Sequence, residues 1–319
     1  MATLSTPDLP SRPRFEDVRG PGFSPLNVLL ALILGGVIVV SFQQAHVSLF
    51  EPFEARNVRS VVRFVSGLFP PSTAPDFLRT IGGLLMETIW ISIAGTTLAF
   101  LLAIPLAAGA MRTRGEESSR ATLGTAGWLA RWGVYGLARM ILNVARAIPE
   151  LVWALVFVVA VGLGPFAGVL ALAAHSAGIL GKLYAELLES VDQRVVEAAR
   201  VTGASESAVT LLVRVPMALP VLLSYTLFRW ECNMRAATVL GFVGAGGIGT
   251  QLSISMKLFQ YNEVLTLALA ILLLVTLVDI VGGIARARIL DAPTIAACEP
   301  AQRSGLVQRA AAFFGRGDG

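Results

Sequence analysis

Three glycines in the C-terminal half stand at a spacing that binds nucleotides in other proteins. In the stretch GFVGAGGIGTQL, Gly244, Gly246 and Gly249 follow the order G-x-G-x-x-G. This order cradles the pyrophosphate of a dinucleotide when it follows a buried strand, opens a helix and precedes an acidic residue by about 20 positions. Here RWECNMRAATVL precedes the glycines, the next acidic residues are Glu263 and Asp279, and an apolar span intervenes. The context argues against a dinucleotide site.

A structural explanation of these glycines has two forms. At membrane depth, glycine lets helices approach closely, and it lets the backbone unwind where protein shields it from lipid. Gly244, Gly246, Gly247 and Gly249 would then be either a pliable gating segment or a site of simple close packing between helices. The sequence leaves both interpretations open.

A group of charged residues interrupts an apolar stretch that begins near Ala218. Arg229, Glu231 and Arg235 lie roughly 16 to 26 Å along a path of about 30 Å, if the stretch is helical. A charge in lipid costs about 2.5 to 3.5 kcal/mol on insertion scales, so these side chains must face protein or water. Glu231 and Arg235 stand in the favoured order for an ion pair on one helix, which leaves Arg229 as a surplus positive charge.

The elements that position these residues are transmembrane helices. Of the 319 residues, 55% are hydrophobic and 14% are charged, and the mean hydropathy is +0.71, which is typical of a polytopic membrane protein. Trp128–Ala147 carries three arginines and is interpreted as an amphipathic segment at the interface. The predicted fold class is an all-α membrane protein with about six transmembrane helices. The predicted spans are Leu26–Phe42, Ile81–Ala110, Ile148–Leu163, Pro165–Leu187, Ala218 to about Leu240, and Val264–Ile284.

The distribution of basic residues predicts the orientation of the chain. With the amino terminus inside, most of the lysines and arginines lie in inside segments, so both termini are predicted to be cytoplasmic. The exception is the arginine-rich segment ARNVRSVVRFVSGLF, which we interpret as a helix on the outer interface. The predicted organisation is a flexible cytoplasmic tail at 1–25, a first span with an external segment at 26–75, a core of further spans at 76–290 that contains the loop at 190–216, and a cytoplasmic tail at 291–319.

Two other features limit the possibilities. A signal peptide is the alternative to a first retained span, but SFQQAHVSLFEP offers no small-residue cleavage site. The two cysteines, Cys232 and Cys298, form neither a disulfide framework nor a metal-ligand spacing. With two histidines and no nucleophile motif, the chain is predicted to have no catalytic residue and no metal site.

The loop at 190–216 has the pattern of two short helices joined by a tight turn. Ala198 and Ala199 give the first helix a small-residue face, Gly203 can adopt the left-handed conformation that ends it, and Ser205 can cap the second. Pro216 is predicted to stop that second helix. The pattern also fits a DNA-binding motif, but the second helix offers Arg214 as its single base and membrane spans flank the loop, so nucleic-acid binding is excluded.

The same residues carry a resemblance to a known family. Glu197-Ala198-Ala199, then Gly203, then VRVP ending in Pro216 resembles the E-A-A-x3-G-x9-I-x-L-P motif of permease subunits in binding-protein-dependent ABC importers. RAIPELVWALVFV, LALAAHSAGILGKLYAELLE and LFRWECNMRAATVLGFVGAGGIG are similar to stretches of phosphonate-type permeases. The likeness runs roughly from Phe69 to Arg288, about two-thirds of the chain.

This resemblance implies a mechanism and a set of partners. The fold would be that of a type I importer permease in a prokaryotic inner membrane, working by alternating access as a homodimer. Glu197, Ala198, Ala199, Gly203 and Pro216 would form the element that docks on a cytoplasmic ABC ATPase dimer, and an external binding protein would supply the cargo. The chain has no G-x-x-x-x-G-K-[ST] loop, so ATP and Mg would be bound by the ATPase and this chain would carry no cofactor.

In such a dimer the two copies would bring two surplus positive charges together. Arg229 and Arg235, with Glu231 and Asn233 beside them, would then line a pathway that favours an anion such as phosphonate or phosphate. The alternative is a structural network that ties this span to its neighbours. Other open functions are a permease for a different solute, a proton-coupled transporter using Asp279 and Glu231, and a membrane dehydrogenase.

Overall fold

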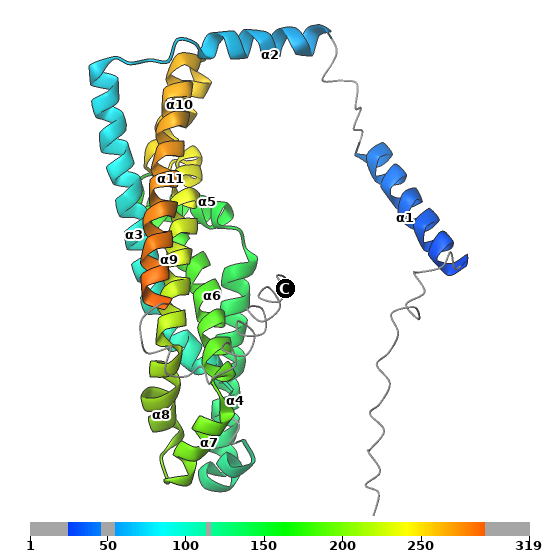
Figure 1. The fold of residues 1–319 in the computed structure, drawn as a ribbon, viewed down its shortest axis with the longest axis vertical. Helices are drawn as coiled ribbons and strands as arrows, with labels where there is room; N and C mark the ends of the chain where they lie inside the picture. Colours follow the sequence, from blue (N-terminus) through cyan, green and yellow to red (C-terminus); the bar gives the residue numbers. More distant parts are fainter. Residues whose placement is uncertain (1–24, 46–54, 113–115, 291–319) are drawn as a thin grey trace, which may run out of the picture. The chain divides into compact units, whose positions relative to one another are not determined.

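The computed structural model describes residues 25–45, 55–112 and 116–290, and these residues are almost entirely helical. The chain divides into two compact units, Met1–Arg63 and Phe64–Gly319, which are described separately. Figure 1 traces the elements in chain order. They are α1 (Pro25–Gln44), α2 (Ala55–Leu68), α3 (Pro75–Ala110), α4 (Glu116–Ala147), α5 (Glu150–Val161), α6 (Pro165–Ser190), α7 (Gln193–Val201), α8 (Glu206–Val209), the π-helical turn η3 (Thr210–Arg214), α9 (Val215–Leu240), the 3-10 turn η4 (Gly241–Val243), α10 (Ile248–Lys257) and α11 (Tyr261–Leu290).

The first unit contains α1 and most of α2. α1 is apolar on all sides and none of its residues is buried by protein. A helix of this kind needs lipid or another protein around it, as expected for a first span. α2 is helical, as its sequence pattern predicts, with Arg56, Arg59 and Arg63 along it. Its position on an outer interface stays a prediction.

Length and hydropathy identify the helices that could cross a membrane. Within the described residues, five continuous helices qualify: α1, α3, α6, α11 and the segment Glu206–Val243, which joins α8, η3, α9 and η4. A sixth arises if α4 from Gly124 onward and α5 are counted as one broken span. The number of spans therefore agrees with the prediction of about six, although the residues of the third span differ.

The third span is where the sequence-based boundaries are wrong. We predicted that Ile148–Leu163 crosses the membrane, but its helix, α5, has 12 residues, or roughly 18 Å against the roughly 30 Å required. The chain bends by 95° between α4 and α5. Pro149 causes the bend because the residue before proline is disfavoured in a helix, and Pro149 itself is extended at ψ 147. Trp128–Ala147, predicted as interfacial, instead belongs to α4 and packs in the bundle.

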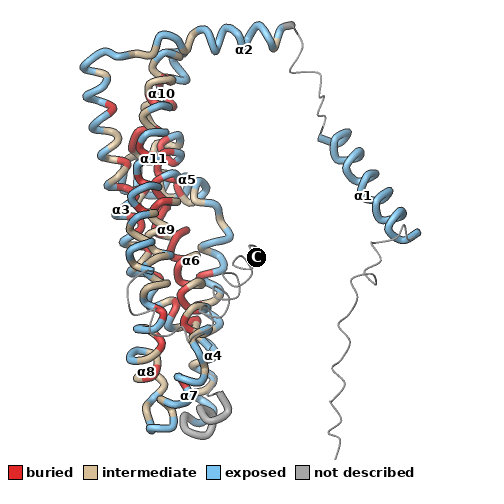
Figure 2. Tube along the Cα trace, viewed as in Figure 1, coloured by how far each residue is buried: buried red, intermediate tan, exposed pale blue. Residues whose placement is uncertain are grey.

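α6 forms the centre of the second unit, where it contacts α3, α4, α5 and α9. Figure 2 shows buried residues concentrated along it. Small residues allow this close packing: a Cβ on Gly178 would lie 2.6 Å from the backbone nitrogen of Arg146, and one on Gly181 would lie 2.5 Å from Leu142. The main core cluster joins α3, α4 and α6. Its buried members are Ala99, Ala103, Ala107, Ala110, Ala138, Leu142, Ala177, Leu180, Tyr184 and Ala185.

The prediction that Pro216 stops a helix is also wrong. Val209, Thr210, Arg214 and Val215 all have right-handed helical backbone angles, so α8 runs through η3 into α9. Pro216 lies in the first turn of α9, where proline is tolerated, and the π-helical turn before it changes the hydrogen-bonding pattern so that the missing N–H is accommodated. The second short helix of the loop is therefore the first part of a long helix.

Candidate coupling loop and charged membrane sites

The loop between α6 and α9 is a rigid turn with an exposed outer side. Asp192 caps α7 by accepting a hydrogen bond from the backbone N–H of Arg194 at 2.9 Å. Ser205 caps α8 in the same way, through the N–H of Ala208 at 3.3 Å. Between the two helices Gly203 has φ +81 and open space around it, so only its backbone conformation requires glycine.

An ion pair holds the two short helices together. The guanidinium of Arg200, in α7, donates to both carboxylate oxygens of Glu206, in α8, at 2.6 and 3.1 Å. Such a bidentate pair fixes both the distance and the orientation of its partners. On α7, Val196 is fully buried, whereas Glu197 and Ala198 are exposed and Ala199 is half-buried. The E-A-A residues therefore lie on a rigid, accessible surface at one end of the bundle (Figure 1).

Two consecutive residues at the end of α6 connect this loop to the bundle. Arg214 of η3 is 1% exposed, and its Nη1 donates to the carbonyl oxygen of Leu188 at 2.8 Å. The next residue, Glu189, accepts from Arg139 of α4 at 3.0 Å and from the backbone N–H of Arg112, just after α3, at 2.7 Å. The C-terminal end of α6 thus contacts the loop, α3 and α4 at one place.

Two of the three charges predicted on α9 pair with α11. Glu231, which is 3% exposed on its side chain, forms an ion pair with Arg286, and Arg235 pairs with Asp279 at 3.4 Å. The predicted pair between Glu231 and Arg235 does not form. Gly282 supplies the physical reason: a Cβ there would collide with the carboxylate of Glu231, so the missing side chain on α11 is what admits the acid.

The third charge, Arg229, is held by a chain of polar side chains across three helices. Its Nε donates to Ser176 Oγ of α6 at 3.0 Å, and Ser176 donates to Asn233 Oδ1 at 2.7 Å. Asn233 in turn donates from Nδ2 to Thr96 Oγ1 of α3 at 2.9 Å. Asn233 thus bonds to two other helices, and no sequence signal pointed to Ser176 or Thr96 as its partners.

The predicted glycine segment forms a loop between η4 and α10. Gly244, Gly246 and Gly247 have φ values of +84, +82 and +74, in the left-handed region that favours glycine. Gly249 is in α10, against the carbonyl oxygen of Thr238. Gly164 donates its backbone N–H to the carbonyl of Gly244 at 2.9 Å, which ties the loop to the chain just before α6.

Two side chains of α3 occupy the amino end of α10. Glu87 Oε1 accepts the N–H of Gly247 at 3.2 Å, and Thr88 Oγ1 accepts that of Ile248 at 2.9 Å. These are the donors that a dinucleotide phosphate would need, so the helix end is already satisfied. Within the described segments no β-strand precedes the glycines. The loop is therefore a packing junction between α3, α6 and α10.

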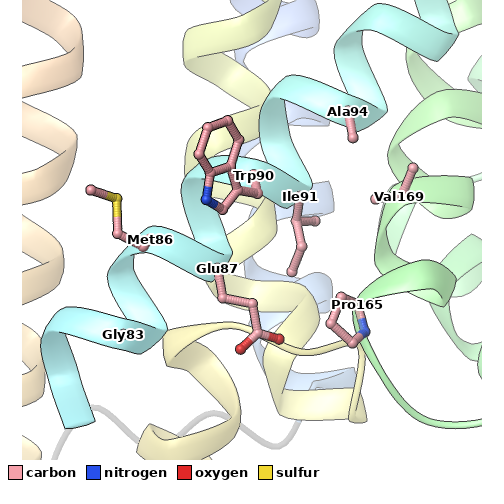
Figure 3. A pocket seen from close by; sticks show the side chains of 8 residues that line it. All are labelled: Gly83, Met86, Glu87, Trp90, Ile91, Ala94, Pro165 and Val169. Atoms are coloured by element: carbon pink, nitrogen blue, oxygen red, sulfur yellow. The ribbon is translucent and has the colours of Figure 1, made fainter.

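A cavity of about 460 Å³ lies beside this junction. Figure 3 shows it between α3, which contributes Glu87 and Trp90, and α6, which contributes Pro165 and Val169. The carboxylate of Glu87 points toward the junction, and most of the other lining side chains are apolar. The cavity is thus a mainly apolar groove with one acid at its edge.

Solved structures identify the fold. A chain of "Inward facing conformations of the MetNI methionine ABC transporter: CY5 native crystal form" superposes with a TM-score of 0.57 at 20% identity, covering 68% of this chain and 99% of that chain. A second, "Crystal structure of an amino acid ABC transporter with histidines", gives a TM-score of 0.51 at 18% identity and covers 72% and 96%. The fold is that of a type I ABC importer permease, as predicted.

The family follows from sequence. Residues 122–291 match "Binding-protein-dependent transport system inner membrane component", and the chain belongs to this family. It is 37% identical over 282 residues to "Phosphite transport system permease protein PtxC" of Stutzerimonas stutzeri, covering 87% of this chain and 95% of the relative. It is 34% identical over 232 residues to "Phosphate-import permease protein PhnE" of Mycolicibacterium smegmatis, covering 73% and 41%. The chain is a permease subunit with several membrane-spanning helices.

Proposed function

We propose that this permease subunit carries a phosphorus oxyanion, of the phosphite, phosphate or phosphonate class, into the cell. The observation that carries the proposal is the 37% identity over 87% of the chain to a phosphite transport permease. Alternating access, with both termini in the cytoplasm, would bring the cargo from an external binding protein to the inside. A different solute is the competing function within the same family, and direct uptake separates the two.

The coupling loop supports the proposed ATPase partner. Glu197 and Ala198 are exposed on α7, and the Arg200–Glu206 pair makes α7 and α8 one rigid body. A rigid body of this kind can transmit the closure of an ATPase dimer to the helices attached to it. ATP and Mg would be bound by that partner. The second permease copy is proposed to be identical, so differently tagged copies of the chain should purify together.

The ion-coupled alternative has weaker support. Its candidate acids, Glu231 and Asp279, are each paired with an arginine, Arg286 and Arg235 respectively. Both acids therefore take part in the packing of α9 against α11, and neither stands apart as a site for a coupling ion.

One experiment tests both the partners and the cargo. The tagged chain is purified gently from its own membranes, and the proteins that accompany it are identified and reconstituted in vesicles with the binding protein. We expect a P-loop ATPase that is lost when residues 197–203 are replaced, and ATP-dependent uptake of labelled phosphite, phosphate or methylphosphonate. A chain that purifies alone, with uptake driven by an ion gradient, would contradict the proposal.

A further inference from the structure

The charges around the middle of α9 balance one another, with one exception. Glu231 and Arg286 neutralise each other, and so do Arg235 and Asp279. Arg229 forms no ion pair with any carboxylate in the described part of the chain. Within the same residues its side chain donates one hydrogen bond, from Nε to Ser176. One unbalanced positive charge therefore remains on α9, and it is half-buried.

The acid next to this region contacts another side chain. Glu150, at the start of α5, lies 3.3 Å from His175 Nε2, and His175 Nδ1 lies 2.9 Å from the carbonyl oxygen of Ile148. A carbonyl oxygen only accepts, so Nδ1 carries a hydrogen. Glu150 is therefore engaged by His175, and no hydrogen bond or ion pair joins it to Arg229 within the described residues.

The polar chain orients Arg229 and leaves its outer nitrogens free. Ser176, Asn233 and Thr96 are all buried, and each bond in the chain fixes the next side chain. Because Ser176 engages Nε, the guanidinium is held by one edge, while Nη1 and Nη2 form no bond with the described residues. A half-buried cation without an ion-pair partner is costly, and a mobile anion would remove that cost.

We infer that Arg229 is the cation of an oxyanion-binding site inside the membrane part of this permease. The free edge of a planar guanidinium matches two oxygens of a phosphorus oxyanion, which makes it better suited than an ammonium group. Ser176, Asn233 and Thr96 are positioning residues, since they act through Arg229. The inference rests on the proposed function and deepens it, because it places the cargo at one residue of α9 and sets Arg235, paired with Asp279, apart from the site.

The test compares Arg229 with an arginine outside the proposed site. In vesicles that contain the permease, its ATPase and its binding protein, Arg229→Gln is expected to lower ATP-driven phosphite uptake by about tenfold or more, as for the loss of a charge-assisted contact. The control, Arg79→Gln in α3, removes an equal charge from an exposed pair with Asp76 and should stay within about twofold. Arg229→Lys, which keeps the charge without the fork, should fall between them.

A second measurement covers the case in which Arg229→Gln does not assemble. Labelled phosphite is equilibrated with the wild-type permease–ATPase complex without binding protein, and saturable binding is expected below about 10 mM, weakened in Ser176→Ala. Absence of saturable binding, or equal uptake by the Arg229→Gln and Arg79→Gln variants, overturns the site. If the wild-type complex transports a solute other than phosphorus oxyanions, the proposed function itself has failed, which is a different result.

Discussion

Arg214 Nη1 donates a hydrogen bond to the carbonyl oxygen of Leu188 at 2.8 Å, and this bond joins the coupling loop to the end of α6. Leu188 lies in the last turn of α6, where carbonyl groups lack partners within the helix and the helix dipole is negative. The buried cation of Arg214 supplies both a donor and a positive charge at that place. The side chain of Arg214 therefore links the loop to α6, and Gln193 Nε2 of α7 adds a bond to the carbonyl oxygen of Glu189 at 3.1 Å.

Replacing this side chain should weaken coupling more than stability. In Arg214→Met, an apolar group of similar length fills the buried site, and such replacements of buried charges are often neutral for folding. Uptake per ATP hydrolysed is expected to fall by roughly twofold to thirtyfold, which corresponds to about 0.5 to 2 kcal/mol of coupling. Reconstituted vesicles in which uptake and hydrolysis are measured together give this ratio. Arg79→Met, at an exposed pair in α3, is the control, and equal ratios in both variants would contradict the prediction.

The effect of a substitution at Gly203 should depend on the backbone preference of the new residue and not on its size. Its φ is +81 and nothing lies within 4 Å of an added Cβ, so the penalty comes from the left-handed conformation, about 1 to 2 kcal/mol for an ordinary residue. We expect Gly203→Ala to lower the melting temperature of the loop region and the amount of ATPase that co-purifies. Gly203→Asn should be milder, because asparagine adopts this conformation more readily.

Gly82→Ala provides the matched control for Gly203. Gly82 also has open space around it, but it lies inside the helix α3, where alanine is favoured by about 1 kcal/mol. The same chemical change should thus stabilise one position and destabilise the other. Similar effects of both substitutions would show that the turn at Gly203 does not depend on its backbone conformation.

The arrangement of the loop was largely predictable because its determinants are local. Ser205 and Gly203 lie within a few residues of the helix ends that they define, and capping and left-handed turns depend on near neighbours. Pro216 was misjudged because a proline signals a boundary, and the sequence does not reveal whether that boundary is an end or the first turn of the next helix. The π-helical turn before Pro216 has no sequence signature of its own.

The partners of the α9 charges were beyond sequence reasoning because they come from distant segments. The spacing of Glu231 and Arg235 favoured a pair on one helix, and tertiary packing overrode it with Arg286 and Asp279. The position of Gly282 opposite Glu231 decides this outcome, and nothing in the sequence around Gly282 distinguishes it from an ordinary membrane glycine. The predicted boundaries of the third span were wrong for a different reason, since hydropathy measures composition and does not reveal the bend at Pro149.

The external position proposed for α2 can be tested by labelling. Ser60 is exposed on α2. Further along the same helix, the ring of Phe64 makes an edge-to-face contact with the ring of Tyr261, the first residue of α11, and the two ring centroids are 5.0 Å apart. In a variant with Cys232 and Cys298 replaced, Ser60→Cys is expected to react with a membrane-impermeant thiol reagent added outside intact cells. Labelling only after the cells are opened would place α2, and the adjoining end of α11, on the cytoplasmic side.

Thr88 should control the order of the glycine loop. This fully buried hydroxyl accepts the N–H of Ile248 at 2.9 Å and donates to the carbonyl of Leu84 at 2.8 Å. Thr88→Val keeps the shape but leaves a buried N–H without a partner, which costs about 1 to 3 kcal/mol. In Thr88→Val we expect faster hydrogen exchange at Ile248 and reduced uptake. Thr88→Ser keeps the hydroxyl and should have the exchange rate and uptake of the unchanged protein.

Thr80→Val separates this effect from the loss of a helix hydrogen bond. Thr80 lies on the same helix, and its hydroxyl makes the equivalent bond to the carbonyl of Asp76 at 2.9 Å, but it is exposed and contacts no other described element through a hydrogen bond. The prediction is therefore a difference: Thr88→Val loosens α10 and Thr80→Val does not. If both variants leave exchange at Ile248 unchanged, Thr88 does not hold the loop, and packing of the glycines against α3 and α6 is sufficient.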